Sequence, residues 1–117
     1  MSRQAIPLRE LEAIFQRIVT PGREYEHVDR LEDAQGVMFL CPKCFEANGG
    51  SVGTHWVLCW FLDRGVSPDE DPKPGRWGAL GTGIDDLELK AGSSSVLLLG
   101  GCNWHGFVRG GKATLTC

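Results

Sequence analysis

Apolar and polar residues follow two different periods along this chain. Over residues 8–19, apolar side chains recur every three or four positions, a spacing that places them on one face of an α-helix. Pro7 suits a first helical turn, and Pro21-Gly22 would end the segment. The pattern predicts an N-terminal helix, within residues 1–22, that packs on the core of its own chain. The apolar positions of this helix face are Leu8, Leu11, Ile14, Phe15, Ile18 and Val19.

Further along the chain the pattern changes to short strands separated by turns. Residues 23–35 are polar and acidic, which is typical of a connector, and residues 36–40 form a short apolar run that leads into Cys41. Residues 54–62 are apolar on both faces of a strand, so we expect them to form a central strand. One face of this predicted strand carries His55, Val57, Cys59 and Phe61, and the other carries Trp56, Leu58, Trp60 and Leu62.

The C-terminal part predicts more strands. Short strand-like runs at residues 87–89 and 96–99 are separated by a Gly/Ser-rich stretch, and two further runs flank Gly110-Gly111. A Gly-Gly pair between two such runs indicates a β-hairpin, because a type I′ turn needs positive φ at both positions. The whole pattern predicts an α+β fold, in which an N-terminal helix packs on a mainly antiparallel β-sheet. We expect a single domain over residues 1–117, with a β-rich core over residues 36–117.

Composition narrows the class of protein. The 117 residues are 42% hydrophobic and 23% charged, which excludes both a disordered chain and a membrane-spanning one. The net charge of −3 argues against general binding to nucleic-acid phosphates. The first ten residues carry charges and no apolar signal segment, and the longest apolar run, residues 56–62, is too short to span a bilayer. We therefore expect a cytoplasmic protein without a membrane partner.

The five cysteines are the main chemical signal. An odd number of cysteines without a secretory signal favours metal binding over a disulfide framework. Cys41 and Cys44 form a C-P-K-C pair, and after 57 intervening residues Cys102 and His105 form a C-N-W-H pair. Two such pairs supply three thiolates and one imidazole, the donor set of a tetrahedral structural zinc site. The sequence predicts a zinc-ribbon-like Cys₃His site, which would join distant strands and leave no open coordination position.

The cysteines also allow interpretations other than a Cys₃His site. A C-P-x-C pair also occurs in thiol–disulfide enzymes, but the residues after Cys44 reach Gly49-Gly50 too soon to form the helix that such chemistry uses. His55 and Cys59 lie about 13 Å apart on a strand and cannot both bind one ion. We expect them to be a partly buried histidine and a core thiol. Cys117 is expected to be a free thiol that could compete for a ligand position.

Two alternative functions depend on residues outside the cysteine motifs. Asp85-Asp86 is expected to be a pair of turn acids, because neighbouring strand residues face opposite sides. An enzyme, such as a metal-dependent hydrolase, could still use His55, Asp85 or Asp86 beside an incompletely closed metal. The segment from residue 90 to residue 117 is basic and aromatic, which would suit a nucleic-acid-binding zinc module. Its relevant residues are Lys90, Trp104, Phe107, Arg109 and Lys112.

Several motifs in residues 36–115 together suggest a family. They are Cys41-Pro42-Lys43-Cys44, Trp77, Gly81-Thr82-Gly83, Asp86-Leu87-Glu88-Leu89 and Cys102-Asn103-Trp104-His105-Gly106-Phe107-Val108. In these motifs the chain resembles a family of small bacteriophage and prophage proteins of unassigned activity. The resemblance implies a phage or prophage origin and a metal site at Cys41, Cys44, Cys102 and His105. Because no catalytic constellation is evident, we expect binding to a host or phage protein rather than catalysis.

Overall fold

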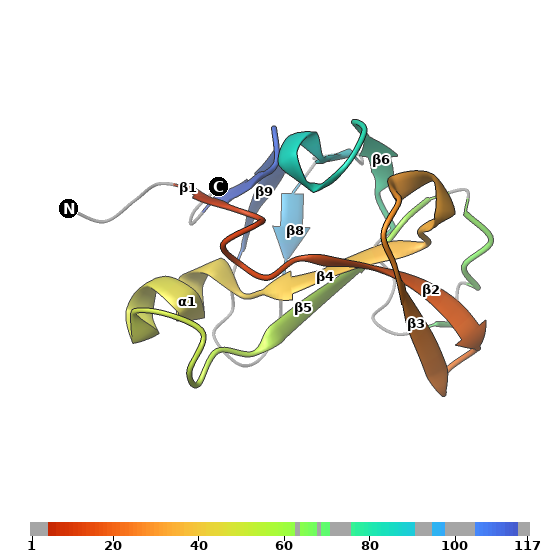
Figure 1. Cartoon of the computed structure of the whole chain (residues 1–117), viewed down its shortest axis with the longest axis horizontal. Coiled ribbons are helices and arrows are strands. Elements are labelled where there is room, and N and C mark those ends of the chain that lie inside the picture. The colour runs from red at the N-terminus through yellow and green to blue at the C-terminus, as the bar shows by residue number, and fades with distance from the viewer. Residues whose placement is uncertain are drawn as a thin grey trace.

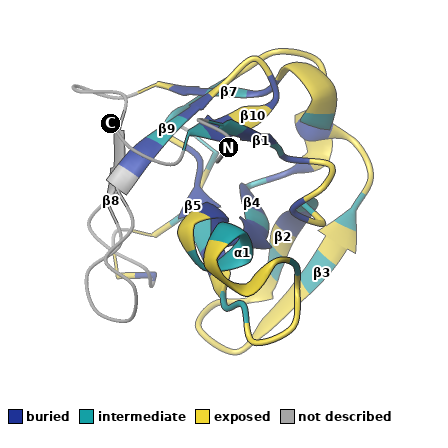
Figure 2. Cartoon of the chain, turned by 90° about the vertical axis from the view of Figure 1, so that its left-hand side faces the viewer, coloured by how far each residue is buried: buried dark blue, intermediate teal, exposed yellow. Residues whose placement is uncertain are grey.

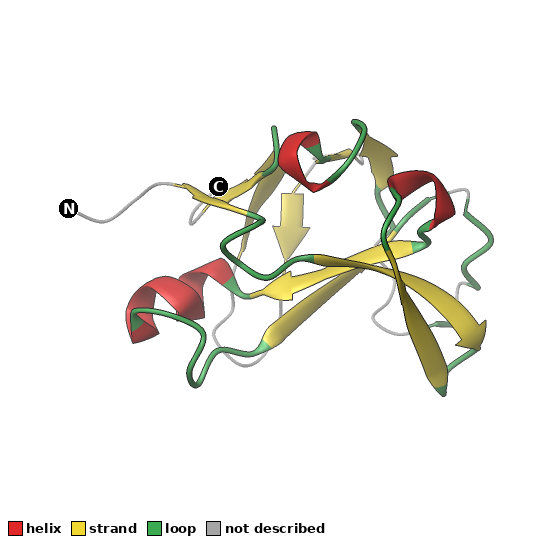
Figure 3. Ribbon diagram, viewed as in Figure 1, coloured by secondary structure: helices red, strands yellow, loops and turns green. Residues whose placement is uncertain are grey.

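The structure is a computed structural model that describes residues 5–62, 64–67, 69–70, 76–90, 95–97 and 105–114, with only the backbone of 95–97 and 105. Over these residues the fold is mainly antiparallel β-structure with one α-helix, α1 (Figures 1 and 3). This agrees with the α+β class. None of the helices in these residues has the length and apolar character needed to cross a membrane.

A four-stranded antiparallel sheet supports the segment that contains Cys41 and Cys44. Its strands are β2 (Ile14–Thr20), β3 (Glu24–Val28), β4 (Gly36–Leu40) and β5 (Trp56–Trp60), in the order β3-β2-β4-β5. β4 and β5 run side by side over their whole length, with Leu40 opposite Trp56 and Gly36 opposite Trp60. Strand β5, predicted to be central, therefore ends the order of its sheet, and β4 takes the inner position.

The N-terminal helix predicted over residues 8–19 is wrong. β1 (Ala5–Pro7) is followed by a turn over residues 8–12 and then by β2. Glu12 has a left-handed backbone with φ 56°, which a right-handed helix cannot contain. Leu8 and Leu11 are still fully buried, but they point into the core from a turn. Residues 14–20 are rich in β-branched side chains and pair with strands on both sides, so tertiary pairing overrides the helical period.

The prediction that residues 23–35 form only an irregular connector is also wrong. It contains the edge strand β3 and a short 3₁₀ turn, η1 (Leu31–Asp33). Most β3 side chains are exposed, which is why the strand shows no apolar pattern. Its hydrogen bonds to β2 hold it in the sheet, and Leu31 of η1 is buried in the core.

A second sheet lies above the first and has the order β1-β10-β9-β8 (Figure 1). Its strands, besides β1, are β8 (Ser95–Leu97), β9 (His105–Arg109) and β10 (Lys112–Thr114). The predicted Gly110-Gly111 hairpin is confirmed, since both glycines have positive φ and Lys112 pairs with Arg109. A small hairpin of β6 (Gly78–Leu80) and β7 (Glu88–Lys90), with the 3₁₀ turn η2 (Ile84–Asp86) between them, completes the described fold.

Both four-stranded sheets contribute side chains to one apolar core (Figure 2). Val57 and Cys59 are buried on one side of β5, as is Phe61 just after it, which confirms the predicted alternation. Val57 pairs with Phe39 of β4, and Cys59 pairs with Val37. The other core members shared between the two sheets and the loops include Ile6, Leu8, Leu11, Phe15, Leu87, Leu89, Val108 and Ala113.

The opposite face of β5 is uneven in its exposure. Trp56 is 44% exposed, whereas Trp60 is fully buried and meets the ring of Tyr25 edge-on, with ring centroids 5.3 Å apart. Gly36, opposite Trp60 on β4, leaves the space that the Trp60 ring needs to lie across the sheet. The C-terminal end of β5 is covered by Trp77, which exchanges backbone hydrogen bonds with Trp60 and Leu62.

Candidate metal centre

The site is built at the end of β4, where the chain turns from strand to helix. Cys41 directly follows the last strand residue and is fully buried at the border of the core. Its backbone N–H donates to the carbonyl oxygen of His55 (2.9 Å), and the N–H of Leu40 donates to Leu11 (2.9 Å). Strand pairing and the N-terminal turn therefore hold the backbone of Cys41 from two sides.

Cys44 belongs to the helix α1 (Pro42–Asn48), which begins directly after Cys41. Pro42 at the first helical position fits because its fixed φ suits a helix start and its missing N–H is not needed there. The N–H of Phe45 donates to the Cys41 carbonyl (2.9 Å), which closes the first turn, and Gly49 ends the helix with φ 69°. Cys44 lies three residues after Cys41 and so on the same side of this turn. Its side chain is partly exposed.

His55 enters the site from the loop that connects α1 with β5. Three hydrogen bonds shape this loop. Gly50 N–H donates to Phe45 (3.0 Å), the Thr54 hydroxyl donates to the Gly50 carbonyl (2.7 Å), and the Asn48 side-chain amide donates to the Thr54 hydroxyl (3.2 Å). Because Leu40 pairs with Trp56, the next position out on each strand brings His55 beside Cys41. The partly buried imidazole then faces the two cysteines.

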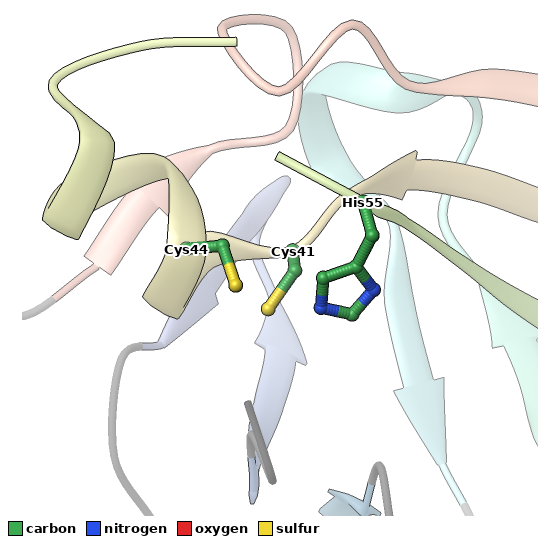
Figure 4. A group of neighbouring side chains, drawn as sticks. All are labelled: Cys41, Cys44 and His55. Atoms are coloured by element: carbon green, nitrogen blue, oxygen red, sulfur yellow. The ribbon is translucent and has the colours of Figure 1, made fainter. Parts of the chain in front are cut away.

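The donor atoms of these three side chains form a compact group. The Sγ atoms of Cys41 and Cys44 and a ring nitrogen of His55 all lie within 4.8 Å of one another. Figure 4 shows Cys41 between the other two, with both sulfur atoms and the ring turned to the same side. A tetrahedral zinc ion places sulfur and nitrogen ligands about 3.5–3.8 Å apart, so shifts of about 1 Å suffice to close the group around one ion. Two thiolates and one imidazole are a donor set that zinc prefers.

The sequence-predicted ligands are therefore brought together in part. Cys41 and Cys44 lie side by side as expected. Cys102 lies outside the described residues; His105 begins β9, where its backbone pairs with Leu97, but its side chain is outside the described part. Their participation stays a prediction.

His55 is the residue that sequence analysis did not assign to the site. The prediction that it is partly buried is confirmed, whereas the prediction that it has no ligand role is not supported, since His55 lies within ligand distance of both cysteines. The sequence contains no signal for this role, because His55 lies beside Cys41 only through the register of β4 with β5, in which Leu40 pairs with Trp56. The helix α1 ends at Asn48, directly before Gly49, so only a short helical segment follows Cys44, as predicted.

Cys59 is a core thiol, as predicted. It is fully buried on β5, and burial raises its pKa to about 12, so it stays protonated at neutral pH. Cys117, expected to be a free thiol, lies outside the described residues.

The acid pair does not join this centre. Asp85 accepts two hydrogen bonds from the Arg9 guanidinium (2.8 and 2.7 Å), and these bonds lower the pKa of Asp85 below its ordinary value. Asp86 accepts hydrogen bonds from the backbone and hydroxyl of Thr82 and from the Gly83 N–H (each 2.9 Å), which lowers its pKa. Both are turn acids, as expected. The cysteine–histidine group among the described residues contains no carboxylate.

The basic residues proposed for nucleic-acid binding lie partly on one hairpin. Arg109 and Lys112 face each other across β9 and β10, and the Arg109 guanidinium covers the Phe107 ring at 4.3 Å from its centroid. Trp104 lies outside the described residues. Binding to nucleic acid stays an untested alternative.

Comparisons with known proteins add no family to this picture. No model of a protein family matches the chain, and no significant similarity to a curated protein or to a solved structure was found.

Proposed function

We propose that this chain is a small zinc-binding protein in which Cys41 and Cys44 hold a structural ion and the folded surface binds a protein partner. The observation that carries the metal proposal is the convergence of two thiols and one imidazole within 4.8 Å. His55 supplies the third donor in this group. Cys102 and His105 are proposed to complete the site, so five candidate donors exist for the four positions of a tetrahedral ion.

Metal analysis of the purified protein tests this proposal directly. We expect one zinc per chain and, after substitution with cobalt, the intense absorption of thiolate coordination. Zinc held at one hundred times its Kd stabilises the folded state by about 2.7 kcal/mol. Chelation should therefore lower the melting temperature by ~10 °C. Protein that purifies without metal, and whose melting temperature does not change with zinc or chelator, would contradict the proposal.

Single substitutions then identify the ligands. Cys41→Ser and Cys44→Ser should each weaken zinc binding strongly, whereas Cys59→Ala is the matched control, because Cys59 is a buried thiol on β5 outside the donor group. His55→Ala and His105→Ala should be measured side by side by competition with a chromophoric chelator. The substitution that removes a ligand should reduce affinity by at least about 10-fold. Equal affinities of all these variants and the wild type would exclude this site.

The proposed partner surface lies next to the metal centre. Trp56 directly follows His55 and is 44% exposed, and Val52 in the same loop is 88% exposed. Exposed apolar side chains close to a rigid site in the sequence favour protein recognition. The family resemblance suggests that the partner is a host or phage protein, which would make the chain a modulator of a host factor or an accessory phage protein.

A binding assay with matched variants tests the partner proposal. Affinity capture from host and phage lysates should retain a partner with the wild type, lose it with Trp56→Ala, and keep it with Leu80→Ala. Leu80 is the control because it is 47% exposed and lies on β6, in a different hairpin. Absence of any stable complex, or equal retention by both variants, would count against this surface.

A further inference from the structure

The two cysteines of the metal centre differ in accessibility although they lie three residues apart. Cys41 is fully buried, whereas Cys44 is partly exposed on the first turn of α1. Both are thiols rather than members of a disulfide. A reagent in solution therefore reaches Cys44 first, and the Sγ atom of Cys41 lies within 4.8 Å of that of Cys44.

The geometry also allows the two sulfur atoms to form a bond. Their Sγ atoms lie within 4.8 Å of each other. The Cα atoms of residues three apart in a helical turn are about 5 Å apart, which lies inside the range of Cα separations seen in disulfides. Rotation about the Cα–Cβ bonds can close the remaining gap, so the strand and the helix can keep their places.

We propose that Cys41 and Cys44 form a redox-active dithiol that, when free of metal, closes to an intramolecular disulfide by exchange with glutathione disulfide. The Cys44 thiolate attacks one sulfur of glutathione disulfide, forms a mixed disulfide and releases one glutathione thiolate. The Cys41 thiolate then attacks Cys44 Sγ, forms the Cys41–Cys44 bond and releases the second glutathione. The two protons lost by the protein thiols end on two glutathione thiols, so two electrons pass from the protein to glutathione.

This exchange and metal binding exclude each other, a consequence that rests on the proposed zinc function. The disulfide consumes both thiolate ligands, so oxidation releases the ion, and a bound ion withholds both sulfurs from exchange. Zinc held at one hundred times its Kd should lower the equilibrium constant for oxidation by about 100-fold. The site would thus bind metal under reducing conditions and release it when glutathione disulfide accumulates.

Cys59 serves as an internal control for chemical selectivity. It is fully buried, and its raised pKa of about 12 leaves almost no thiolate at neutral pH. We expect Cys59 to stay reduced at glutathione ratios that oxidise the pair.

The experiment uses the full chain, stripped of metal by a chelator and equilibrated in glutathione buffers of increasing oxidised fraction. After acid quenching and alkylation, trypsin cleaves at Arg30, Lys43 and Arg64, so Cys41 and Cys44 fall on different peptides, residues 31–43 and 44–64. We expect these two peptides to become linked by a disulfide, with a loss of 2 Da for the intact protein. Because Cys59 shares the peptide of Cys44, Cys59→Ala should preserve the link and Cys44→Ser should abolish it.

Clear results would overturn the proposal. They are a pair that remains alkylated as thiols in excess glutathione disulfide, a mixed disulfide on Cys44 that never closes, or a link from residues 31–43 to a peptide other than 44–64. Far-ultraviolet circular dichroism of each variant confirms that it is folded before its redox state is scored. Closure without zinc binding would support the dithiol and contradict the metal proposal, whereas zinc binding without closure would do the reverse.

Discussion

Glycine at position 36 is required by the way Trp60 lies across the sheet. A methyl group at this position would be 2.6 Å from Cε3 of Trp60 and 2.8 Å from the backbone oxygen of Cys59. Carbon atoms in contact prefer about 3.5–4.0 Å, so the overlap is about 1 Å. The Trp60 ring is fully buried against Tyr25, and the Cys59 oxygen belongs to the neighbouring strand. Neither group can move away without disturbing the packing or the pairing of β4 with β5.

We therefore expect Gly36→Ala to lower the free energy of unfolding by about 1–3 kcal/mol, the usual cost of overpacking a core. For a chain of this length the melting temperature should fall by about 4–12 °C. Urea denaturation followed by tryptophan fluorescence measures the first quantity, and a thermal scan by circular dichroism measures the second. The metal site lies at the other end of the β4–β5 pair, so zinc affinity should not change.

Gly83→Ala is the matched control for this substitution. Nothing lies within 4 Å of a methyl group at position 83, and the backbone there is extended, with φ −177°. We expect a change within about 0.5 kcal/mol. The reasoning is refuted if the Gly36→Ala protein unfolds at the wild-type urea concentration, or if both substitutions cost the same.

Three further predictions concern other parts of the fold. Amide hydrogen bonds keep the pKa of Asp86 below its ordinary value, so ionised Asp86 stabilises the folded state above pH ~3.9, and this stabilisation is lost as the pH falls toward the folded pKa. The difference in urea stability between wild type and Asp86→Asn should therefore shrink from pH 6 to pH 3. A constant difference would contradict this prediction. A methyl group at Gly111 (φ 76°) would overlap the backbone of η2, whereas Gly110 (φ 56°) faces open space, so Gly111→Ala should lower the melting temperature more than Gly110→Ala. Glu70 is 4% exposed and accepts hydrogen bonds from the Tyr25 hydroxyl and a backbone amide (2.8 Å each). Glu70→Ala should therefore cost about 1–3 kcal/mol in urea unfolding and Glu70→Gln less, because the amide oxygen can still accept; equal losses would argue against these bonds.

Structural features that depend only on residues close together in the sequence could be predicted from the sequence. Gly110-Gly111 specifies a hairpin because its two positive φ angles are easily reached only by glycine, and the alternating apolar residues of β5 specify its buried face. The Cys41-Pro42-Lys43-Cys44 segment brings its two sulfurs together because the residues are three apart in one turn. Each of these outcomes needs only local backbone geometry and the period of the side chains.

Other features were decided by contacts between distant segments. The apolar period of residues 8–19 fits a helix, yet residues 14–20 form β2, because pairing with β3 and β4 satisfies their backbone groups and suits their β-branched side chains. His55 becomes a candidate ligand only through the register of β4 with β5, which is set by the whole hairpin and its connecting loop. The sequence by itself determined which residues could bind a metal and where the chain could turn. The tertiary structure decided which donors meet, because strand register brings together residues that are far apart in the sequence, and their sequence separation does not predict their distance in space.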